Sequence, residues 1–437
     1  MSVFNRDADG DVSRGAKAVI ALPDLSQGNA RRDIDARLDE AAGLAEAIGI
    51  EVVEKLHFRI RGAKAGTLFG SGQVEMIAEA VDRTGAELLI VDASITPIQQ
   101  KNLETGTKAK VIDRTGLILE IFGERAATSE GRLQVELAHL DYQAGRLVRS
   151  WTHLERQRGG FGFLGGPGET QIEADRRLIR DRMAKLKKEL EQVTRTRTLH
   201  RARRQRAPWP VIALVGYTNA GKSTLFNRLT RADVMAENLL FATLDPTMRE
   251  IELPGFDKAI LSDTVGFISE LPTQLVAAFR ATLEEVISAD LIIHVRDISH
   301  PDSDAQRQDV EQVLADIGAG GEGGAPMIEA WNKIDALPEE EAESVRTEAL
   351  RREEVVVISA LTGEGVDTLM ECAGEHLRKG AKVRHITLSA GAGEAIAWLH
   401  ANGEVVAQRN EGAETEYEVR LSDADWARFE SRWPQPA

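Results

Sequence analysis

A short apolar run that leads into a glycine-rich loop and then a helix constrains this chain more than any other feature. Residues 210–215, PVIALV, have the composition of a buried parallel strand. The loop GYTNAGKS follows directly and matches GxxxxGK[ST], and TLFNRLTR continues it as a helix. In this setting the glycines let backbone N–H groups wrap phosphates, so we expect an α/β domain built on a phosphate-binding loop. The residues of that loop are Gly216, Tyr217, Thr218, Asn219, Ala220, Gly221, Lys222 and Ser223.

Two segments together predict a phosphate and metal site. Lys222 brings a positive charge to the β- and γ-phosphates of a nucleotide, and the Ser223 hydroxyl is placed to ligate Mg²⁺. A second strand-like run ends at DTVG, where Asp263 can hold the magnesium ion through water and Gly266 can donate its N–H to a γ-phosphate. We therefore assign the whole segment to the nucleotide. Its residues are Asp263, Thr264, Val265 and Gly266.

The stretch between these motifs, ENLLFATLDPTMRE, is loop-like and contains a candidate switch. A threonine here would reach Mg²⁺ when a γ-phosphate is present and release it after hydrolysis. Thr243 is the candidate metal ligand, and Thr247 competes with it on sequence alone. Together with Lys222 and Gly266, Thr243 forms the predicted catalytic set. The neighbouring residues expected at the nucleotide are Phe241, Ala242, Leu244 and Asp245.

Two loops farther along the chain identify the base. MIEAWNKID places Asn332, Lys333, Ile334 and Asp335 after another apolar strand. The Asp335 carboxylate can accept hydrogen bonds from guanine N1–H and N2–H₂, whereas a buried aspartate facing adenine would lose roughly 1–3 kcal/mol. VVVISAL then ends in a loop whose backbone N–H can meet guanine O6. The four motifs, in this order and each after a strand, predict GTP as the substrate. The residues of the O6 loop are Ser359, Ala360 and Leu361.

One position departs from the common pattern of such sites. After DTVG a glutamine often orients the attacking water, but this chain has Phe267. A phenyl ring cannot orient water by hydrogen bonding. We therefore expect slow intrinsic hydrolysis of GTP, with the missing polar group supplied by another residue or by a partner. This favours a switch controlled by its target over a metabolic enzyme.

The remainder of the chain divides into three further regions. Residues 1–125 alternate strand-like segments (AKAVIAL, IEVVEKLHF, AELLIVDA, AKVIDR) with helical ones and predict a small α/β domain with parallel pairing. Residues 126–206 predict a charged helical pair, residues 207–380 the P-loop domain, and residues 381–437 a small α+β domain. In the first domain GTLFGSG enters a helix, where it resembles a phosphate loop. Because it lacks a lysine, we expect a plain strand-to-helix turn.

A glycine-rich stretch at residues 158–168, RGGFGFLGGPG, contains the dinucleotide-loop pattern GxGxxG. It fails the test of context, because polar residues precede it and a helical pattern follows it where a strand is required. The stretch instead joins two helices in residues 146–206, where 17 Lys and Arg stand against 7 Asp and Glu in a chain of net charge −16. Such segregation favours a docking surface for nucleic acid over a merely solvated helix face.

Composition limits the class of protein further. No apolar run is long enough to span a membrane, and the polar N-terminal residues lack a signal-peptide pattern. A single cysteine, Cys372, excludes an internal disulfide and a cysteine-based zinc site. We expect a monomeric protein of the reducing cytoplasm, with peripheral membrane association as the alternative location.

With these motifs placed, the chain resembles the HflX family, ribosome-associated GTPases of the Obg–HflX group. The resemblance covers nearly the whole length and rests on LFATLDPT, DTVGFISELPTQLVAAFRATLEE and GGFGFLGGPGETQIEADRR. It implies that Thr243 is the Mg²⁺ ligand and that a hydrophobic residue is usual at position 267. It also implies a protein that binds the large ribosomal subunit, dissociates stalled or idle ribosomes, and hydrolyses GTP with ribosome stimulation.

The resemblance gives the glycine-rich loop a role. We expect Phe161 and Phe163 to stack on unpaired RNA bases, with Arg176 and Arg177 also contacting RNA, near the peptidyl-transferase region. A merely flexible connection between two helices is the alternative. The alternative functions are tRNA modification, ribosome assembly, ATP-linked RNA remodelling by the N-terminal domain, and a GTP-dependent scaffold for a protein partner. GTPases that modify tRNA end in a cysteine-bearing motif. This sequence has no cysteine after Cys372, which disfavours tRNA modification.

Overall fold

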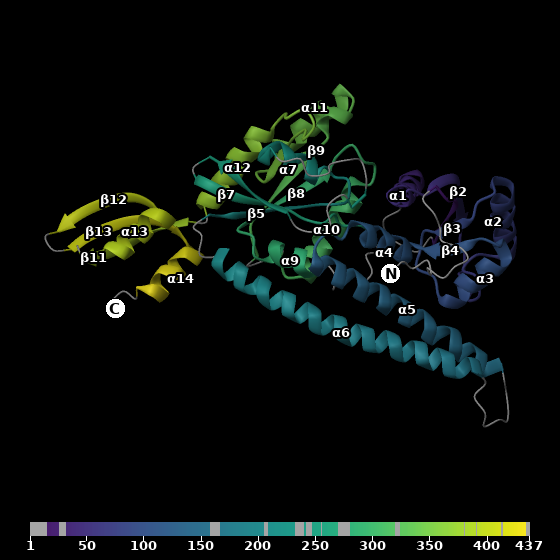
Figure 1. Cartoon of the computed structure of the whole chain (residues 1–437). Coiled ribbons are helices and arrows are strands. Elements are labelled where there is room, and N and C mark those ends of the chain that lie inside the picture. The colour runs from purple at the N-terminus through teal and green to yellow at the C-terminus, as the bar shows by residue number, and fades with distance from the viewer. Residues whose placement is uncertain are drawn as a thin grey trace.

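A computed structural model of the chain shows three sheet-containing domains and a pair of long helices. Figure 1 shows the six-stranded sheet in the middle, the N-terminal domain on one side of it and the C-terminal domain on the opposite side. The long helices run side by side along the lower part of the view. The structure describes residues 15–25, 32–157, 167–204, 209–231, 240–241, 247–254, 256–269, 280–319, 324–379, 381–389, 391–411 and 414–433.

The N-terminal domain contains a four-stranded parallel sheet in the order β2-β1-β3-β4, as the strand-like segments predict. The central strand β1 is buried along nearly its whole length, because helices cover both faces of the sheet. Helix α4 follows β4 directly. The elements are β1 (Lys17–Asp24), α1 (Ile34–Glu46), β2 (Glu51–Arg59), α2 (Ser71–Thr84), β3 (Leu88–Val91), α3 (Pro97–Thr107), β4 (Lys110–Asp113) and α4 (Arg114–Arg125).

The two long helices are α5 (Ser129–Gln157) and α6 (Pro167–Arg204), which confirms the predicted helical pair. The first half of α5 packs against the N-terminal domain, where Val135 and Ala138 are buried in its core. Helix α6 returns alongside α5 and is held there by buried Leu186 and by a hydrogen bond of 2.8 Å from Arg182 Nε to Glu136 Oε1. The described contacts thus join the pair to the N-terminal domain through α5, and join α6 to α5.

The central domain contains a six-stranded sheet in the order β10-β9-β8-β5-β7-β6, in which only β6 runs antiparallel to its neighbour. Short apolar strands such as VIALV and LIIHV are buried on both faces, as is typical of parallel sheets. Helices α9 and α10 cover one face, and α7 and α12 cover the other. The elements are β5 (Val211–Val215), α7 (Lys222–Thr230), β6 (Thr247–Leu253), β7 (Phe256–Asp263), α9 (Arg280–Ile287), β8 (Leu291–Asp297), α10 (Ser303–Asp316), β9 (Met327–Asn332), η1 (Ile334–Ala336), α11 (Glu339–Ala349), β10 (Val355–Val357) and α12 (Val366–Lys379).

The C-terminal domain is an antiparallel sheet in the order β11-β13-β12 with two helices on one face, which confirms the predicted α+β architecture. Alternate residues of β13, including Tyr417 and Val419, point into a core that Phe429 and Leu399 of the helices complete. The elements are β11 (Ala381–Ser389), α13 (Gly393–Asn402), β12 (Glu404–Glu411), β13 (Glu414–Ser422) and α14 (Asp423–Arg432). Throughout the described part of the chain, each helix is too short or too polar to cross a bilayer.

Candidate nucleotide-binding site

The predicted nucleotide motifs gather at one edge of the six-stranded sheet. Strands β5, β7, β8, β9 and β10 are mutually parallel, so the loops at their carboxyl ends meet at the same edge. Strand β5 leads into Gly216, β7 ends at Asp263, β9 ends at Asn332, and β10 is followed by Ser359. The structure therefore brings together the phosphate, metal and base segments that are separate in sequence.

Two glycines of the phosphate loop are required by close contacts. A Cβ atom on Gly216 would lie 2.2 Å from the carbonyl oxygen of Val295 on the neighbouring strand. Gly221 has a φ of +97°, and a Cβ there would lie 2.2 Å from Nδ2 of Asn332. Only glycine allows the loop to pass this close to β8 and to the base-reading segment. Asn219, also in the loop, adopts the left-handed region with a φ of 59°.

Lys222 lies at the first turn of α7 with its side chain folded into the loop. Its Nζ donates to the carbonyl oxygens of Gly216, at 3.1 Å, and Tyr217, at 2.8 Å. Burial lowers the pKa of Lys222 to about 8, and the nearby Asp263 carboxylate opposes this shift. An anionic phosphate beside the ammonium group would raise the pKa again. The protein without a nucleotide therefore stabilises the protonated form of Lys222 poorly. Bound phosphates would stabilise this form.

This environment predicts that nucleotide affinity falls with rising pH. The protonated lysine binds phosphate better, so affinity is full below the pKa of the free protein and is lost above it, by up to about tenfold per pH unit. We expect the dissociation constant for GDP to be level up to about pH 7.5 and to rise as the pH passes about 8. Fluorescence titration with a labelled GDP measures this. In Lys222→Arg, which stays protonated, the dependence should vanish, and a level profile in the wild type would contradict the prediction.

Ser223 and Asp263 provide the oxygen ligands expected of a magnesium site. The Ser223 hydroxyl donates to Asp263 Oδ2 at 2.8 Å, and the Asp263 side chain is fully buried at the end of β7. Hydroxyl and carboxylate oxygens are the donors that Mg²⁺ prefers, so these residues fit the ion. Thr247 is the first residue of β6 and pairs with Asp263. Ala242, Thr243, Leu244 and Asp245 lie outside the described residues.

The DTVG segment lies against the phosphate loop through its backbone. The Thr264 hydroxyl donates to the carbonyl oxygen of Leu214 at 2.6 Å, and Val265 is buried in the core, so both side chains fix the segment rather than face the loop. Gly266 approaches so closely that a Cβ would lie 2.8 Å from Thr218 Cα and 3.1 Å from Lys222 Nζ. Its peptide is therefore the part of the segment nearest to the phosphate lysine.

Phe267 continues this contact through its backbone, while its side chain is buried. Its backbone pairs with the loop, since Thr218 N–H donates to Phe267 O at 2.7 Å and Phe267 N–H donates to Gly216 O at 3.1 Å. The ring is only 2% exposed and belongs to the core that also contains Ile268 and Leu283. A ring buried there cannot position a water molecule.

The burial of Phe267 predicts the result of restoring glutamine at this position. We expect Phe267→Gln to leave the basal rate of GTP hydrolysis no faster and to destabilise the protein by about 3–5 kcal/mol, because a large apolar side chain is lost from the core. Urea denaturation and a phosphate-release assay measure the two effects. Trp209→Gln, at a side chain that is 37% exposed, is the matched control and should cost much less. A faster and fully stable Phe267→Gln variant would refute this account of the ring.

The base-reading residues form a connected group. The Asn332 side chain donates to the carbonyl oxygen of Ala220 at 2.7 Å and accepts from Ala360 N–H at 2.8 Å, so it joins the phosphate loop to the O6 loop.

Lys333 has a φ of 68°, and its Nζ lies 2.7 Å from Asp297 Oδ2. Asp335 is exposed in the short helix η1, where its carboxylate is open to a ligand. Among the others, Ile334 and Ser359 are buried and Leu361 is exposed.

Tyr217 has a contact that its place in the motif does not predict. Its hydroxyl donates to Glu40 Oε2 of α1 at 2.6 Å and accepts from Ser269 N–H at 2.9 Å. Arg114 of α4 donates to Glu40 and, at 2.9 Å, to Ser269 Oγ. Although burial raises the pKa of Glu40, the Arg114 guanidinium and the Tyr217 hydroxyl hold it below its usual value. The N-terminal domain thus contacts both the phosphate loop and the segment after DTVG.

Phe241 adds an apolar part to the same domain contact. Its backbone N–H donates to Thr218 Oγ1 at 3.1 Å, and its ring packs edge-to-face on Phe122 of α4 with centroids 4.7 Å apart. Leu240 meanwhile contacts α1 at Gly43. No local sequence signal indicates the contacts with Phe122 and Gly43, because each joins residues that are more than a hundred positions apart.

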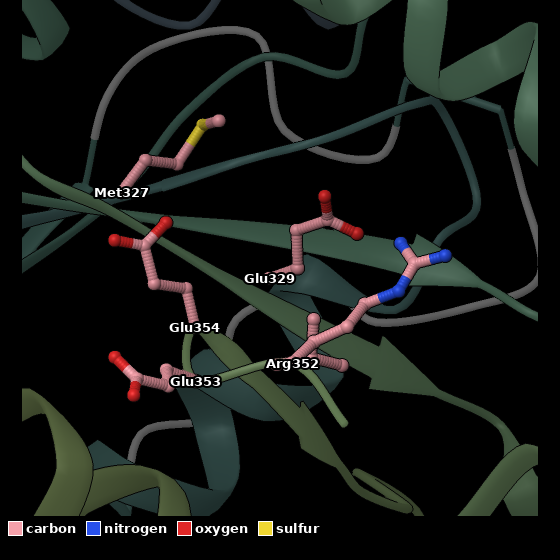
Figure 2. Close-up of a pocket in the computed structure, with 6 residues that line it drawn as sticks. Met327, Glu329, Arg352, Glu353 and Glu354 are labelled. Carbon is pink, nitrogen blue, oxygen red and sulfur yellow. The ribbon is translucent and has the colours of Figure 1, made fainter. Parts of the chain in front are cut away.

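A pocket of about 300 Å³ lies elsewhere on the same domain. Figure 2 shows Met327 and Glu329 of β9 beside Arg352, Glu353 and Glu354 of the segment that precedes β10. These residues lie at the amino ends of the two strands, whereas the nucleotide motifs lie at the carboxyl ends. The pocket is therefore separate from the candidate nucleotide site.

Of the predicted RNA-contacting residues, the structure describes the two arginines. Arg176 is half-buried and Arg177 exposed near the beginning of α6. Phe161 and Phe163 lie outside the described residues.

The fold and the grouped motifs define a P-loop nucleotide-binding domain flanked by additional domains. Family models match the chain along most of its length and agree with that class. Residues 35–123 match "GTP-binding GTPase N-terminal", residues 125–204 "GTP-binding GTPase Middle Region", residues 211–333 "50S ribosome-binding GTPase", and residues 344–435 "HflX C-terminal domain".

Known relatives identify the family. The chain is 49% identical over 393 residues to GTPase HflX of Magnetococcus marinus, which covers 90% of each chain. It is 46% identical over 340 residues to GTPase HflX of Escherichia coli, covering 78% of this chain and 79% of the relative. A third HflX, from Caldanaerobacter subterraneus, is 45% identical over 346 residues and covers 79% of this chain and 78% of its own length. The chain belongs to the HflX family and is a GTPase.

Proposed function

We propose that this GTPase binds the large ribosomal subunit, dissociates stalled or idle ribosomes, and hydrolyses GTP when the ribosome stimulates it. The observation that carries the proposal is the match of residues 211–333 to a model described as a 50S ribosome-binding GTPase. The basic helical pair supports it, because a surface that docks on RNA needs concentrated positive charge. The buried Phe267 supports the dependence on a partner, since its ring leaves the position without a group that orients water.

In the proposed mechanism each motif has one task. The amides of residues 216–223 and the Lys222 ammonium hold the β- and γ-phosphates, while Gly266 N–H faces the γ-phosphate. Magnesium, when bound, neutralises charge between these phosphates; Ser223 would ligate it directly, together with Thr243, and Asp263 through water. Asp335 accepts from guanine N1–H and N2–H₂. Hydrolysis then requires a water molecule in line with the γ-phosphate, which we expect the ribosome-bound state to orient.

The γ-phosphate also explains how the switch reaches the rest of the molecule. Gly266 lies close to Thr218 and Lys222, so we expect a γ-phosphate bound beside Lys222 to displace the segment after DTVG. That segment is tied to α1 and α4 through Ser269, and the helical pair is packed on the same domain. Binding of GTP would therefore change the contact between the central and N-terminal domains, and with it the orientation of the basic helices.

We expect RNA to dock on the described part of α6. Apart from the half-buried Arg176, the basic side chains of residues 176–188 are exposed, although Arg182 also pairs with Glu136 of α5. Arginines and lysines that bind RNA phosphates displace the counterions held by those phosphates, so binding should weaken steeply with salt.

Variants of the helical pair test the proposal. We expect the double variant Phe161→Ala, Phe163→Ala to lose binding to purified large subunits and ribosome splitting, because stacking on unpaired bases is worth about 1–3 kcal/mol per ring. Arg176→Ser with Arg177→Ser should weaken binding less and reduce its salt dependence. Co-sedimentation with a non-hydrolysable GTP analogue measures both. Arg351→Ser with Arg352→Ser, in the central domain, is the control, and unchanged binding by the phenylalanine variant would defeat the assignment of the loop.

A further inference from the structure

Arg228 of α7 contacts the backbone of the predicted O6 loop. Its Nε donates to the carbonyl oxygen of Ala360 at 2.7 Å, and its Nη2 donates to the carbonyl oxygen of Leu361. The guanidinium also lies over Gly363, where a Cβ would be 2.6 Å from Nη1. Gly363 has a φ of +97°, which favours glycine, and the absence of a side chain there leaves space for the arginine. A single planar group thus binds two adjacent carbonyl oxygens of the loop and lies beside Gly363.

The inner side of the same loop is held by the base-reading asparagine. Ala360 N–H donates to Asn332 Oδ1 at 2.8 Å, and Asn332 in turn donates to Ala220 of the phosphate loop. Within the loop, Thr362 N–H donates to Ser359 Oγ at 3.0 Å and Gly363 N–H donates to Ser359 O at 2.8 Å. These bonds use neither the Ala360 carbonyl nor the Leu361 N–H. The peptide between Ala360 and Leu361 is instead held by Arg228.

The peptide plane makes this contact relevant to the base. The carbonyl of Ala360 and the N–H of Leu361 belong to one rigid plane, in which they point in opposite directions. Because Arg228 holds the carbonyl, it also fixes the direction of the N–H. Arginine suits this task, since its planar fork binds two adjacent carbonyl oxygens with little loss of its own freedom.

We propose that Arg228 is a positioning residue for guanine recognition, which orients the backbone N–H of the Ala360–Leu361 peptide toward guanine O6. The inference rests on the assignment of Asp335 and residues 359–361 to the base. Helix α7 begins with Lys222, so the helix that brings the lysine to the phosphates also carries, two turns on, the arginine that shapes the base loop. Arg228 therefore couples the two ends of the nucleotide site without contacting the nucleotide itself.

The test compares GDP with 6-thioguanosine diphosphate, in which sulfur, a poor acceptor, replaces O6 while the edge read by Asp335 is kept. We expect the wild type to prefer GDP. Arg228→Ala should weaken GDP binding by about tenfold, as for the loss of one charge-assisted hydrogen bond, and should bind the thio analogue almost as well as the wild type does. The KM for GTP should rise by a similar factor with kcat unchanged. Arg228→Lys, with one donor direction in place of the fork, should recover part of the preference.

Matched measurements separate this role from general stability. Arg351→Ala, at an exposed arginine after α11, should change neither affinity, and thermal unfolding without nucleotide reports whether Arg228→Ala remains folded. Equal weakening of both diphosphates by Arg228→Ala and Arg228→Lys would overturn the proposal, as would an unchanged preference for GDP. If the wild type itself does not distinguish the two diphosphates, the assignment of this loop to guanine O6 fails, and the role of Arg228 fails with it.

Discussion

Replacing Asp335 with asparagine is expected to weaken GTP binding by about 10²- to 10³-fold and to create binding of xanthosine triphosphate. The carboxylate accepts from two guanine donors, N1–H and N2–H₂, and hydrogen bonds to charged groups are worth about 1.5–3 kcal/mol each. Asparagine offers a donor where xanthine has the acceptor O2, so the mismatch with guanine becomes a match with xanthine. The exposed position of Asp335 in η1, at the carboxyl edge of the sheet, leaves the rest of the site intact.

Competition between labelled GDP and unlabelled nucleotides measures this exchange. Asp367→Asn, at an exposed aspartate in the first turn of α12, is the matched control and should leave both affinities as in the wild type. If Asp335→Asn weakened GTP without any gain for the xanthine nucleotide, the residue would support the loop instead of reading the base. If it changed neither affinity, the base-reading assignment would be wrong.

Replacing Arg114 with alanine is expected to destabilise the N-terminal domain by about 3–5 kcal/mol. Arg114 is buried and pairs with two acidic side chains that are themselves largely buried, Glu40 and Asp92. Removing the cation takes the closest charged partner from both carboxylates. Asp92 retains Arg37, 3.5 Å away, and Glu40 retains the neutral Tyr217 hydroxyl, so we expect the loss to cost more than the pair itself contributes. The same change removes the hydrogen bond from Arg114 to Ser269 Oγ, so the contact between the N-terminal domain and the segment after DTVG should weaken as well.

Urea denaturation followed by circular dichroism measures the loss. Arg83→Ala, which removes the exposed pair with Glu54 in the same domain, should cost at most about 1 kcal/mol. The difference between wild type and Arg114→Ala should shrink in acid. In the wild type the pKa of Glu40 is lowered, so its contribution is present above the unfolded pKa and is lost as the pH falls through the folded pKa. A loss no larger than that of Arg83→Ala would show that the buried pair is not required.

The parts of the nucleotide site that lie within one short segment can be predicted from the sequence. The phosphate loop, DTVG and NKID each combine a strand with a loop whose residue types have one chemical use, and parallel pairing then places them at one edge. The N-terminal strands and the C-terminal antiparallel sheet are predictable for a similar reason, since their apolar patterns fit buried parallel strands in one case and alternation in the other.

The features that the sequence does not indicate are contacts between segments that lie far apart along the chain. The hydroxyl of Tyr217 meets Glu40, which lies 177 positions earlier, and the pairing exists only because α1 packs on the phosphate loop. Phe267 reads in sequence as a missing catalytic group, while the structure adds that its ring belongs to the core. Arg228 reads as an ordinary exposed helix residue, and only the fold of residues 359–363 brings it to the base loop.

The central claim, a GTPase whose hydrolysis is switched on by the large ribosomal subunit, is tested most directly by its turnover rate. GTP hydrolysis by the purified protein should be measured alone and with increasing amounts of purified large subunits. We predict a slow basal rate that rises by about 10²-fold or more, as when a partner completes the catalytic site of a GTPase. A rate that is already fast alone, or that large subunits leave unchanged, would contradict the account, because the catalytic group would then lie within this chain or the target would lie elsewhere.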